Sequence, residues 1–89
     1  MSWYVYLIEC RGGSIYTGIA IDVATRYAAH RAGKGARYTR SRPPIRLLAV
    51  FAMVDKSAAL REERRIKQLS AREKRALAGH FDVVAADSS

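Results

Sequence analysis

A pair of adjacent glycines, Gly12-Gly13, constrains the fold of this chain more than any other feature. The glycines separate two runs, residues 3–10 and 14–20, that are rich in Val, Ile, Thr and aromatic residues, the types that β-strands favour. Glycine adopts the positive φ angles that tight hairpin turns require. The chain is therefore expected to begin with a β-hairpin.

The middle of the chain contains one helix signal and one apolar run. Asp22 is a good N-cap for a helix over roughly 23–32, which Gly33 and Gly35 would end. The run 47–54 is short, almost continuously apolar and preceded by a proline pair. It predicts a central strand that is covered on both faces.

Two further helices are expected after this strand. Asp55 or Ser57 would cap a helix over roughly 57–68. A capping box at residues 70–73 would begin a third, short helix, which Gly79 would end. The predicted order is therefore β-β-α-β-α-α.

The length of 89 residues allows one domain with a single modest core. Residues 1–84 are expected to form this domain, and residues 85–89 are expected to be a frayed tail. The predicted fold class is α/β, a small three-stranded antiparallel sheet flanked by helices.

The net charge is the first indication of function. Sixteen basic and eight acidic residues leave a net charge of +8, which points to a polyanionic partner such as nucleic acid. No segment pairs a large apolar face with a basic one, so no membrane contact is expected, and no protein partner is implied. The N-terminus lacks the features of a signal peptide, and the single cysteine, Cys10, lies in an apolar run and is expected to be a buried packing residue. We expect a cytoplasmic protein.

The positive charge is concentrated between residues 26 and 46, where seven basic residues occur with no acidic one. Residues 33–45 are expected to form a basic loop. Basic side chains with interleaved tyrosines suit a phosphate backbone, although a solvated surface loop would have the same composition. The expected nucleic-acid contacts are Lys34, Arg37, Tyr38, Arg40 and Arg42.

Two tyrosine tripeptides have their tyrosines ten residues apart, at 5–7 (Val-Tyr-Leu) and 16–18 (Tyr-Thr-Gly). Arg26 follows ten residues after Tyr16, with His30 one helical turn later. This ordered set resembles the GIY-YIG nuclease family. The similarity continues through residues 33–39 and 59–67, a pattern typical of the short stand-alone (YhbQ-like) branch, and covers roughly residues 3–78.

This resemblance implies metal-dependent hydrolysis of phosphodiesters, in DNA more than RNA and without strong sequence specificity. Arg26 would contact the phosphate, since a planar guanidinium suits the charge that develops on its oxygens. Tyr16 would be the catalytic tyrosine, with Tyr6 in support and His30 near the site. Glu63 would hold the divalent ion, Mg²⁺ or Mn²⁺, and one carboxylate is enough for such an ion.

Each of these residues also has a simpler interpretation. The tyrosines could pack in strands, Arg26 could be solvated, and His30 could cap or pack. Glu63 could pair with Lys67, and Glu62 falls in the same apolar arc of the helix, so only the resemblance selects Glu63. The chain also contains no asparagine and has Ile19 where some family members have lysine. The alternative function is a nucleic-acid-binding module with weak or no catalysis.

The resemblance also bears on the register of the hairpin, because it requires Tyr6 and Tyr16 on one face of the sheet. A two-residue loop would place them on opposite faces. We therefore predict a three-residue loop, 11–13, with Gly13 at a left-handed bulge position. Cys10 would then lie opposite Ser14, and Ile8 opposite Tyr16.

Overall fold

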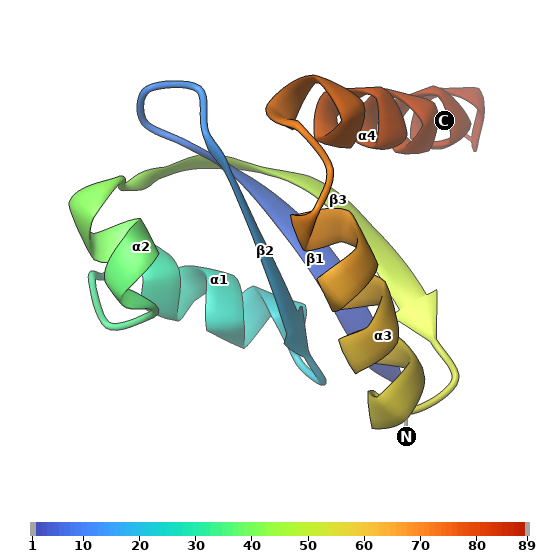
Figure 1. Cartoon of the computed structure of the whole chain (residues 1–89), viewed down its shortest axis with the longest axis horizontal. Coiled ribbons are helices and arrows are strands. Elements are labelled where there is room, and N and C mark those ends of the chain that lie inside the picture. The colour runs from blue at the N-terminus through green and yellow to red at the C-terminus, as the bar shows by residue number, and fades with distance from the viewer. Residues whose placement is uncertain (1, 89) are drawn as a thin grey trace.

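The computed structural model describes the backbone of residues 2–88 and the side chains of residues 2–79, and it shows one antiparallel sheet with helices on both faces (Figure 1). The element order matches the predicted one apart from an additional short helix within the basic segment. The elements are β1 (Trp3–Cys10), β2 (Ile15–Ala20), α1 (Val23–Arg31), α2 (Arg37–Ser41), β3 (Pro44–Met53), α3 (Lys56–Lys67) and α4 (Ala71–Ser88).

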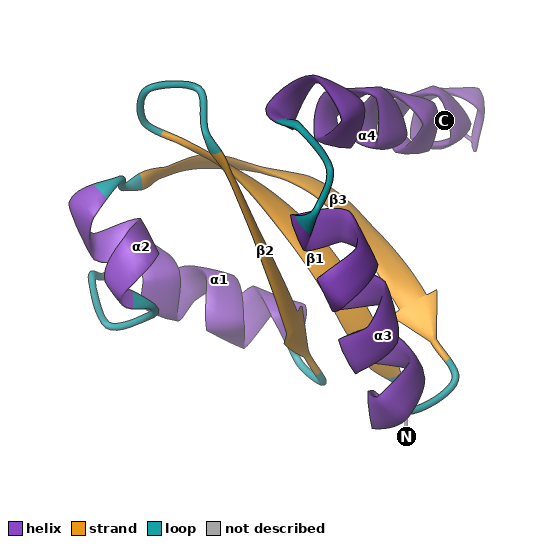
Figure 2. Cartoon of the chain, viewed as in Figure 1, coloured by secondary structure: helices purple, strands orange, loops and turns teal. Residues whose placement is uncertain are grey.

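The sheet has the order β2-β1-β3, with both pairings antiparallel (Figure 2). The predicted fold class is confirmed, but the prediction that the apolar run 47–54 forms the central strand is wrong. That run belongs to β3, an edge strand, and the central strand is β1. Pro44 begins β3 and lacks a backbone N–H, which an edge strand tolerates. Ile45 and Leu47 remain exposed there, whereas β1 buries Val5 and Leu7 completely.

The sheet has two differently composed faces. Alternate residues of β1 point to opposite faces, as in any strand. One face packs under α3 and α4 and is mainly aliphatic, formed by Val5, Leu7, Ile15, Leu48, Ala49, Ala59, Ile66 and Ala78. The other packs under α1 and α2 around Tyr6, Ile8, Cys10 and Ala20, with Tyr16, Tyr27 and Tyr38 against them.

The hairpin has the predicted three-residue loop. Ile8 lies opposite Tyr16, and the Cys10 N–H donates to the Ser14 carbonyl at 2.8 Å. Gly13 has a φ of 88°, as the bulge requires, and Gly12 has the same positive value, which the prediction did not include. The register places Tyr6 and Tyr16 on the same face of the sheet, and the predicted burial of Cys10 is confirmed.

The helix starts follow the capping signals in the sequence. The Asp22 carboxylate accepts from the Thr25 N–H at 3.1 Å, and Asp55 accepts from the Ala58 N–H at 2.8 Å. Ser70 and Glu73 form the predicted reciprocal capping box, with bonds of 2.8 and 3.1 Å. The caps therefore place α1, α3 and α4 where the sequence predicted their first turns.

The predicted end of the third helix at Gly79 is wrong, because α4 continues to Ser88. Gly79 does not adopt a positive φ, so it is an interior helical residue and not a C-cap. A lone glycine inside a helix costs only about 1 kcal/mol, which is too little to end it. The proposed division into a domain of residues 1–84 and a frayed tail stays a prediction, and Ser89 lies outside the described residues.

The basic segment also differs from the prediction. It was expected to be a loop throughout residues 33–45, but it contains the short helix α2. The turn is stabilised locally, because the Arg40 and Arg42 N–H groups donate to the carbonyls of Ala36 and Tyr38. Within the described residues, no helix is long and apolar enough to cross a membrane.

Candidate active site

Four aromatic rings from four elements meet on the face of the sheet that α1 and α2 cover. Tyr6 comes from β1, Tyr16 from β2, His30 from α1 and Tyr38 from α2. The Tyr16 ring is central, with its centroid 6.3 Å from Tyr6, 5.0 Å from His30 and 5.7 Å from Tyr38. Residues far apart in the sequence thus form one contiguous cluster, which we call the aromatic cluster.

A chain of hydrogen bonds runs through this cluster. The Tyr6 hydroxyl lies 2.9 Å from His30 Nε2, His30 Nδ1 lies 2.7 Å from the Thr39 hydroxyl, and that hydroxyl lies 3.0 Å from the Ala36 carbonyl oxygen. Because a carbonyl only accepts, Thr39 must donate to Ala36 and accept from His30 Nδ1–H. The Nε2 atom of a neutral His30 is then unprotonated, and it accepts a hydrogen bond from the Tyr6 hydroxyl.

Burial keeps both partners of that last bond uncharged. His30 and Tyr6 are each about 1% exposed. Burial and the nearby Arg26 charge lower the pKa of His30, so the imidazole is neutral, as the hydrogen-bond chain requires. Burial, with the neighbouring Tyr16, raises the pKa of Tyr6 to about 12, so its hydroxyl keeps its proton.

Two glycines make room for this arrangement. Gly18 lies directly opposite Tyr6 in the sheet, and a Cβ atom there would come within 2.5 Å of the Tyr6 hydroxyl oxygen. A Cβ atom at Gly35 would collide with the His30 ring. Neither glycine has a positive φ, so close approach of a side chain, and not backbone conformation, is what requires glycine here.

The two tyrosines of the tripeptides have different surroundings. The Tyr6 hydroxyl is buried and hydrogen-bonded to His30. Tyr16 is only half-buried, and its hydroxyl makes no hydrogen bond among the described residues. The hydroxyl of Tyr16 is therefore the one that can meet a water molecule or a substrate.

Arg26 and Glu63 approach the cluster from different helices. Arg26 is exposed on α1, one turn before His30. Its charge and a side-chain hydrogen bond act to lower the pKa of Tyr6, while the charge of Glu63, on α3, acts to raise it. Glu63 also pairs with Lys67, whose Nζ lies 3.2 Å from its carboxylate. A cation and a carboxylate thus lie near the same buried phenol.

Glu63 is the residue that could contribute a ligand to a metal ion here. Its side chain is 19% exposed and lines a hollow of about 330 Å³ with Leu60, Arg64, Lys67 and Gln68. Over the part of the chain with described side chains, no three His, Cys, Asp or Glu residues cluster as a metal site. A single accessible carboxylate suits a magnesium-like ion, which keeps several waters and takes other ligands from substrate phosphates.

Glu62, the other candidate carboxylate in the same helical arc, is differently placed. Arg65 binds it with two bonds of 2.6 and 3.0 Å, and this pairing lowers the pKa of Glu62. Glu62 lines a different hollow, between α3, α4 and β3, so it faces away from the hollow that Glu63 lines. The two glutamates that the helical pattern could not separate therefore have different environments.

The basic segment borders the aromatic cluster. Tyr38 belongs to the cluster, and the Arg42 guanidinium carbon lies 5.1 Å from the centre of the Tyr38 ring. The remaining residues predicted to contact nucleic acid are exposed on α2 or directly before it, namely Lys34, Arg37 and Arg40. The segment thus forms a cationic border beside Tyr16.

Sequence reasoning missed three residues of this site. Gly18 could have been found from the hairpin register, since any register that places Ile8 opposite Tyr16 also places Gly18 opposite Tyr6. Thr39 and Gly35 carried no such signal, because their contacts with His30 depend on how the segment after α1 folds back.

Known proteins with similar sequences identify the family to which this site belongs. The family model for the GIY-YIG catalytic domain matches residues 2–76. A UPF0213 protein of Cupriavidus pinatubonensis is 58% identical over 72 residues, 81% of this chain and 80% of the relative. A UPF0213 protein of Halobacterium salinarum is 51% identical over 74 residues, 83% of this chain and 96% of the relative.

Two solved structures are also similar. The solution NMR structure of a UPF0213 protein from Bacillus halodurans has 48% sequence identity and a TM-score of 0.55, covering 89% of this chain and 84% of that one. The solution NMR structure of an E. faecalis protein has 30% identity and a TM-score of 0.62, covering 93% and 88%. Sequence and fold comparisons therefore agree over most of the chain.

Proposed function

The chain belongs to the GIY-YIG family, in its short stand-alone (YhbQ-like) branch, and from that premise we propose that it is a metal-dependent endonuclease. Its substrate would be the phosphodiester bond of DNA, cut without strong sequence specificity. The exposed cations of the basic segment suit phosphate contacts, which carry no sequence information.

One observation carries the proposal: Tyr16, whose hydroxyl has no hydrogen bond among the described residues, packs against the buried neutral His30 and against Tyr6, which the charges of Arg26 and Glu63 both reach. The ring of Tyr16 is 5.0 Å from His30, and the charges of Arg26 and Glu63 both reach the neighbouring Tyr6. A strand tyrosine that served only packing would need none of these groups beside it.

Each residue has a separate role in the proposed hydrolysis. The attacking water oxygen forms a bond to phosphorus while the bond to the leaving oxygen breaks. The Tyr16 oxygen, after giving its own proton to solvent, accepts the proton of the water, and the leaving oxygen takes up a proton from solvent. Arg26 stabilises the negative charge that grows on the non-bridging oxygens. Tyr6 and His30, fixed by Thr39, hold the Tyr16 ring in place. A divalent ion at Glu63, Mg²⁺ or Mn²⁺, would supply charge neutralisation at the phosphate.

A nucleic-acid-binding module without catalysis is the second candidate function. It would use the same basic segment and is favoured by the absence of asparagine and by Ile19 in place of a lysine. Glu63 argues against it, because its carboxylate repels phosphate, and its pairing with Lys67 neutralises a cation that a binding surface would use. Metal-dependent cutting separates the two functions.

The decisive experiment offers purified protein labelled single-stranded, duplex and branched DNA and the matching RNAs, each with Mg²⁺, Mn²⁺ or a chelator. We expect cutting of DNA that requires the ion and stops with the chelator. Cutting that survives the chelator would contradict the proposal. Binding to every substrate without cutting of any would leave the binding module as the function.

A matched pair of variants tests the metal assignment. Glu63→Gln should raise the ion concentration needed for half-maximal cutting, and excess ion should restore part of the rate. Glu62→Gln is the control, because Glu62 is a neighbour on the same helix but is bound by Arg65 and lines a different hollow. Equal metal dependence in the two variants would show that Glu63 does not hold the ion.

A further inference from the structure

The hollow that contains Glu63 continues along the outside of α3. A second hollow, of about 390 Å³, shares Leu60, Arg64 and Gln68 with the first and extends it to Ser57 and Arg61. We call this combined surface the α3 groove, defined by Leu60, Arg61, Glu63, Arg64, Lys67 and Gln68. It starts at the carboxylate assigned to the metal ion and leads away from it.

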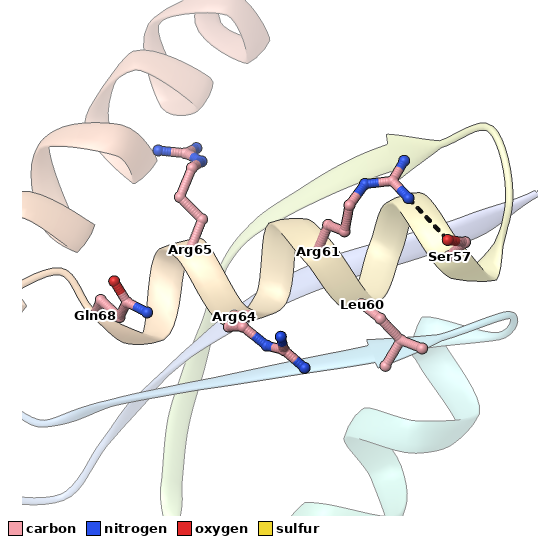
Figure 3. A pocket seen from close by; sticks show the side chains of 6 residues that line it. All are labelled: Ser57, Leu60, Arg61, Arg64, Arg65 and Gln68. Carbon is pink, nitrogen blue, oxygen red and sulfur yellow. Dashed lines mark hydrogen bonds between the residues drawn. The ribbon is translucent and has the colours of Figure 1, made fainter.

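The groove residues recur every three to four positions, so they form one stripe along the helix. Figure 3 shows Leu60 and Arg64 projecting to the same side of α3, whereas Arg61 and Arg65 project to the other side. Arg61 and Arg64 therefore lie on either side of the exposed crest of the helix. Leu60, on the same side as Arg64, is 44% exposed and offers an apolar contact that a sugar or a base could cover.

The cations of the groove are not all neutralised by the protein. Lys67 pairs with Glu63, and Arg65 pairs with Glu62. Arg64 has no hydrogen bond or ion pair among the described residues, and Arg61 donates only to the Ser57 hydroxyl, at 2.8 Å. This leaves two arginines, three residues apart on one helix, without a carboxylate partner.

Such an arrangement destabilises the free helix. Like charges at i,i+3 or i,i+4 disfavour a helix, and Arg61, Arg64 and Lys67 follow one another at this spacing. The helix dipole favours cations in the last turn, which accounts for Arg64 and Lys67, but Arg61 lies a turn earlier. An anionic partner in the groove would remove the repulsion.

We propose that the α3 groove is a second nucleic-acid backbone surface, which binds the strand on the far side of the cut from α2. This inference rests on the proposed function. The basic segment around α2 borders Tyr16, and the α3 groove begins at Glu63, so the scissile phosphate lies between two cationic surfaces. The substrate is therefore a nucleic acid long enough to reach both surfaces, and not a terminal mononucleotide.

The first test measures binding to a fluorescent DNA duplex in chelator, across a range of salt concentrations, so that it does not depend on catalysis. Each lost phosphate contact should flatten the salt dependence by about one unit of slope. The double variant Arg61→Ala, Arg64→Ala should bind more weakly than the unmutated protein. The ratio of its dissociation constant to that of the unmutated protein should be about 16-fold larger at roughly 50 mM than at roughly 200 mM salt.

Two further variants are compared with this double variant. Lys56→Ala removes a cation from the same helix, but the Lys56 ammonium lies over the Trp3 ring, outside the groove, so its slope should stay unchanged. The triple variant Arg37→Ala, Arg40→Ala, Arg42→Ala should flatten the slope independently, and the two sets should add. An unchanged slope in the Arg61/Arg64 variant would overturn the inference, as would an equal change in Lys56→Ala.

The second test locates the nucleic acid directly. Arg64→Cys and Lys56→Cys are each labelled with a photoactivated cross-linker, and the native Cys10 is fully buried and should not react in the folded protein. We expect cross-links to duplex DNA from position 64 and not from position 56. No cross-link from position 64 would overturn the inference even if the protein cuts DNA. Cross-linking and the slope change without any cutting would instead overturn only the proposed nuclease activity.

Discussion

The two faces of the sheet are built from the same strands but differ in what holds them together. Under α3 and α4 the buried side chains are aliphatic, such as Leu7 and Ile66, and packing alone stabilises them. Under α1 and α2 the buried groups include Tyr6, His30 and Thr39, which are joined by hydrogen bonds. The aliphatic face therefore supplies apolar packing, and the face under α1 and α2 carries the polar cluster, which Glu63 approaches from α3.

This difference shows how an 89-residue chain can bury a polar site without losing its core. A buried polar group costs free energy unless it is paired, and the α1 side pairs Tyr6, His30 and Thr39 in one chain that ends on the Ala36 carbonyl. The aliphatic face depends on apolar packing, and the hydroxyl of Thr17, buried there opposite Leu7, has no hydrogen-bond partner among the described residues. Substitutions of buried residues on the aliphatic face should therefore lower stability, and those of the hydrogen-bonded residues under α1 and α2 should change activity or acid sensitivity.

Ile66→Ala should have the largest effect on stability. Ile66 is fully buried under the sheet, so truncation leaves a cavity and should cost about 2–5 kcal/mol of unfolding free energy. Urea denaturation followed by circular dichroism measures this. Leu60→Ala, on the same helix but 44% exposed, is the control and should change stability far less. Equal losses from both variants would mean that burial under the sheet does not set the stability of the aliphatic face.

Arg26→Ala should have the largest effect on activity. Arg26 is exposed, so stability should stay unchanged, but loss of a donor to the phosphate should slow cutting by about a hundred- to a thousand-fold at saturating metal. Single-turnover cutting rates measure it. Arg31→Ala removes the same charge from the same helix and should leave the rate nearly unchanged. A slow Arg31→Ala protein would mean that helix charge, and not the Arg26 position, matters.

Thr39→Val should lower stability and also disturb the active site, with smaller effects than the two preceding variants. Valine has nearly the same shape but leaves the His30 Nδ1–H without an acceptor, which should cost about 1–3 kcal/mol. The ¹⁵N chemical shifts of the imidazole report the tautomer, and we expect the fixed Nδ1–H form only in the unmutated protein. Thr39→Ser keeps the hydroxyl and should keep the tautomer. An unchanged tautomer in Thr39→Val would remove Thr39 from its positioning role.

Acid pH should produce the smallest and most gradual effect. The pKa of His30 is lowered in the folded protein by burial and by Arg26, so protonation favours the unfolded chain. The stabilisation is complete above the ordinary histidine value of about 6.5 and is lost as pH falls below it towards the folded-state pKa. Urea midpoints between roughly pH 4 and 8 measure the loss.

His30→Gln is the matched control for this pH series, because His80 is present in both proteins. The part of the acid destabilisation that His30 causes should be missing from the variant. A pH profile identical to that of the unmutated protein would mean that His30 is not the buried neutral group.

Much of the fold follows from local signals in the sequence. The capping residues Asp22, Asp55 and Ser70 determine where helices begin, because each satisfies backbone N–H groups a few residues away. These capping contacts lie within a few residues along the chain, so the sequence alone determines them. The loop glycines predict the hairpin but fit two registers, and only the resemblance to the family selects the one that places Tyr6 and Tyr16 on one face.

Long-range packing decided the rest. Apolar content could not tell that β1 is central and β3 an edge strand, because strand order depends on which surfaces the helices cover. Gly79 looked like a helix end, yet its backbone stays helical. The helical pattern flagged Glu62 and Glu63 equally, and only the hollow beside Arg64 and Lys67 separates them. The Tyr6–His30–Thr39 chain likewise joins β1, α1 and α2, and contacts between elements so distant in sequence exist only once the tertiary structure has formed.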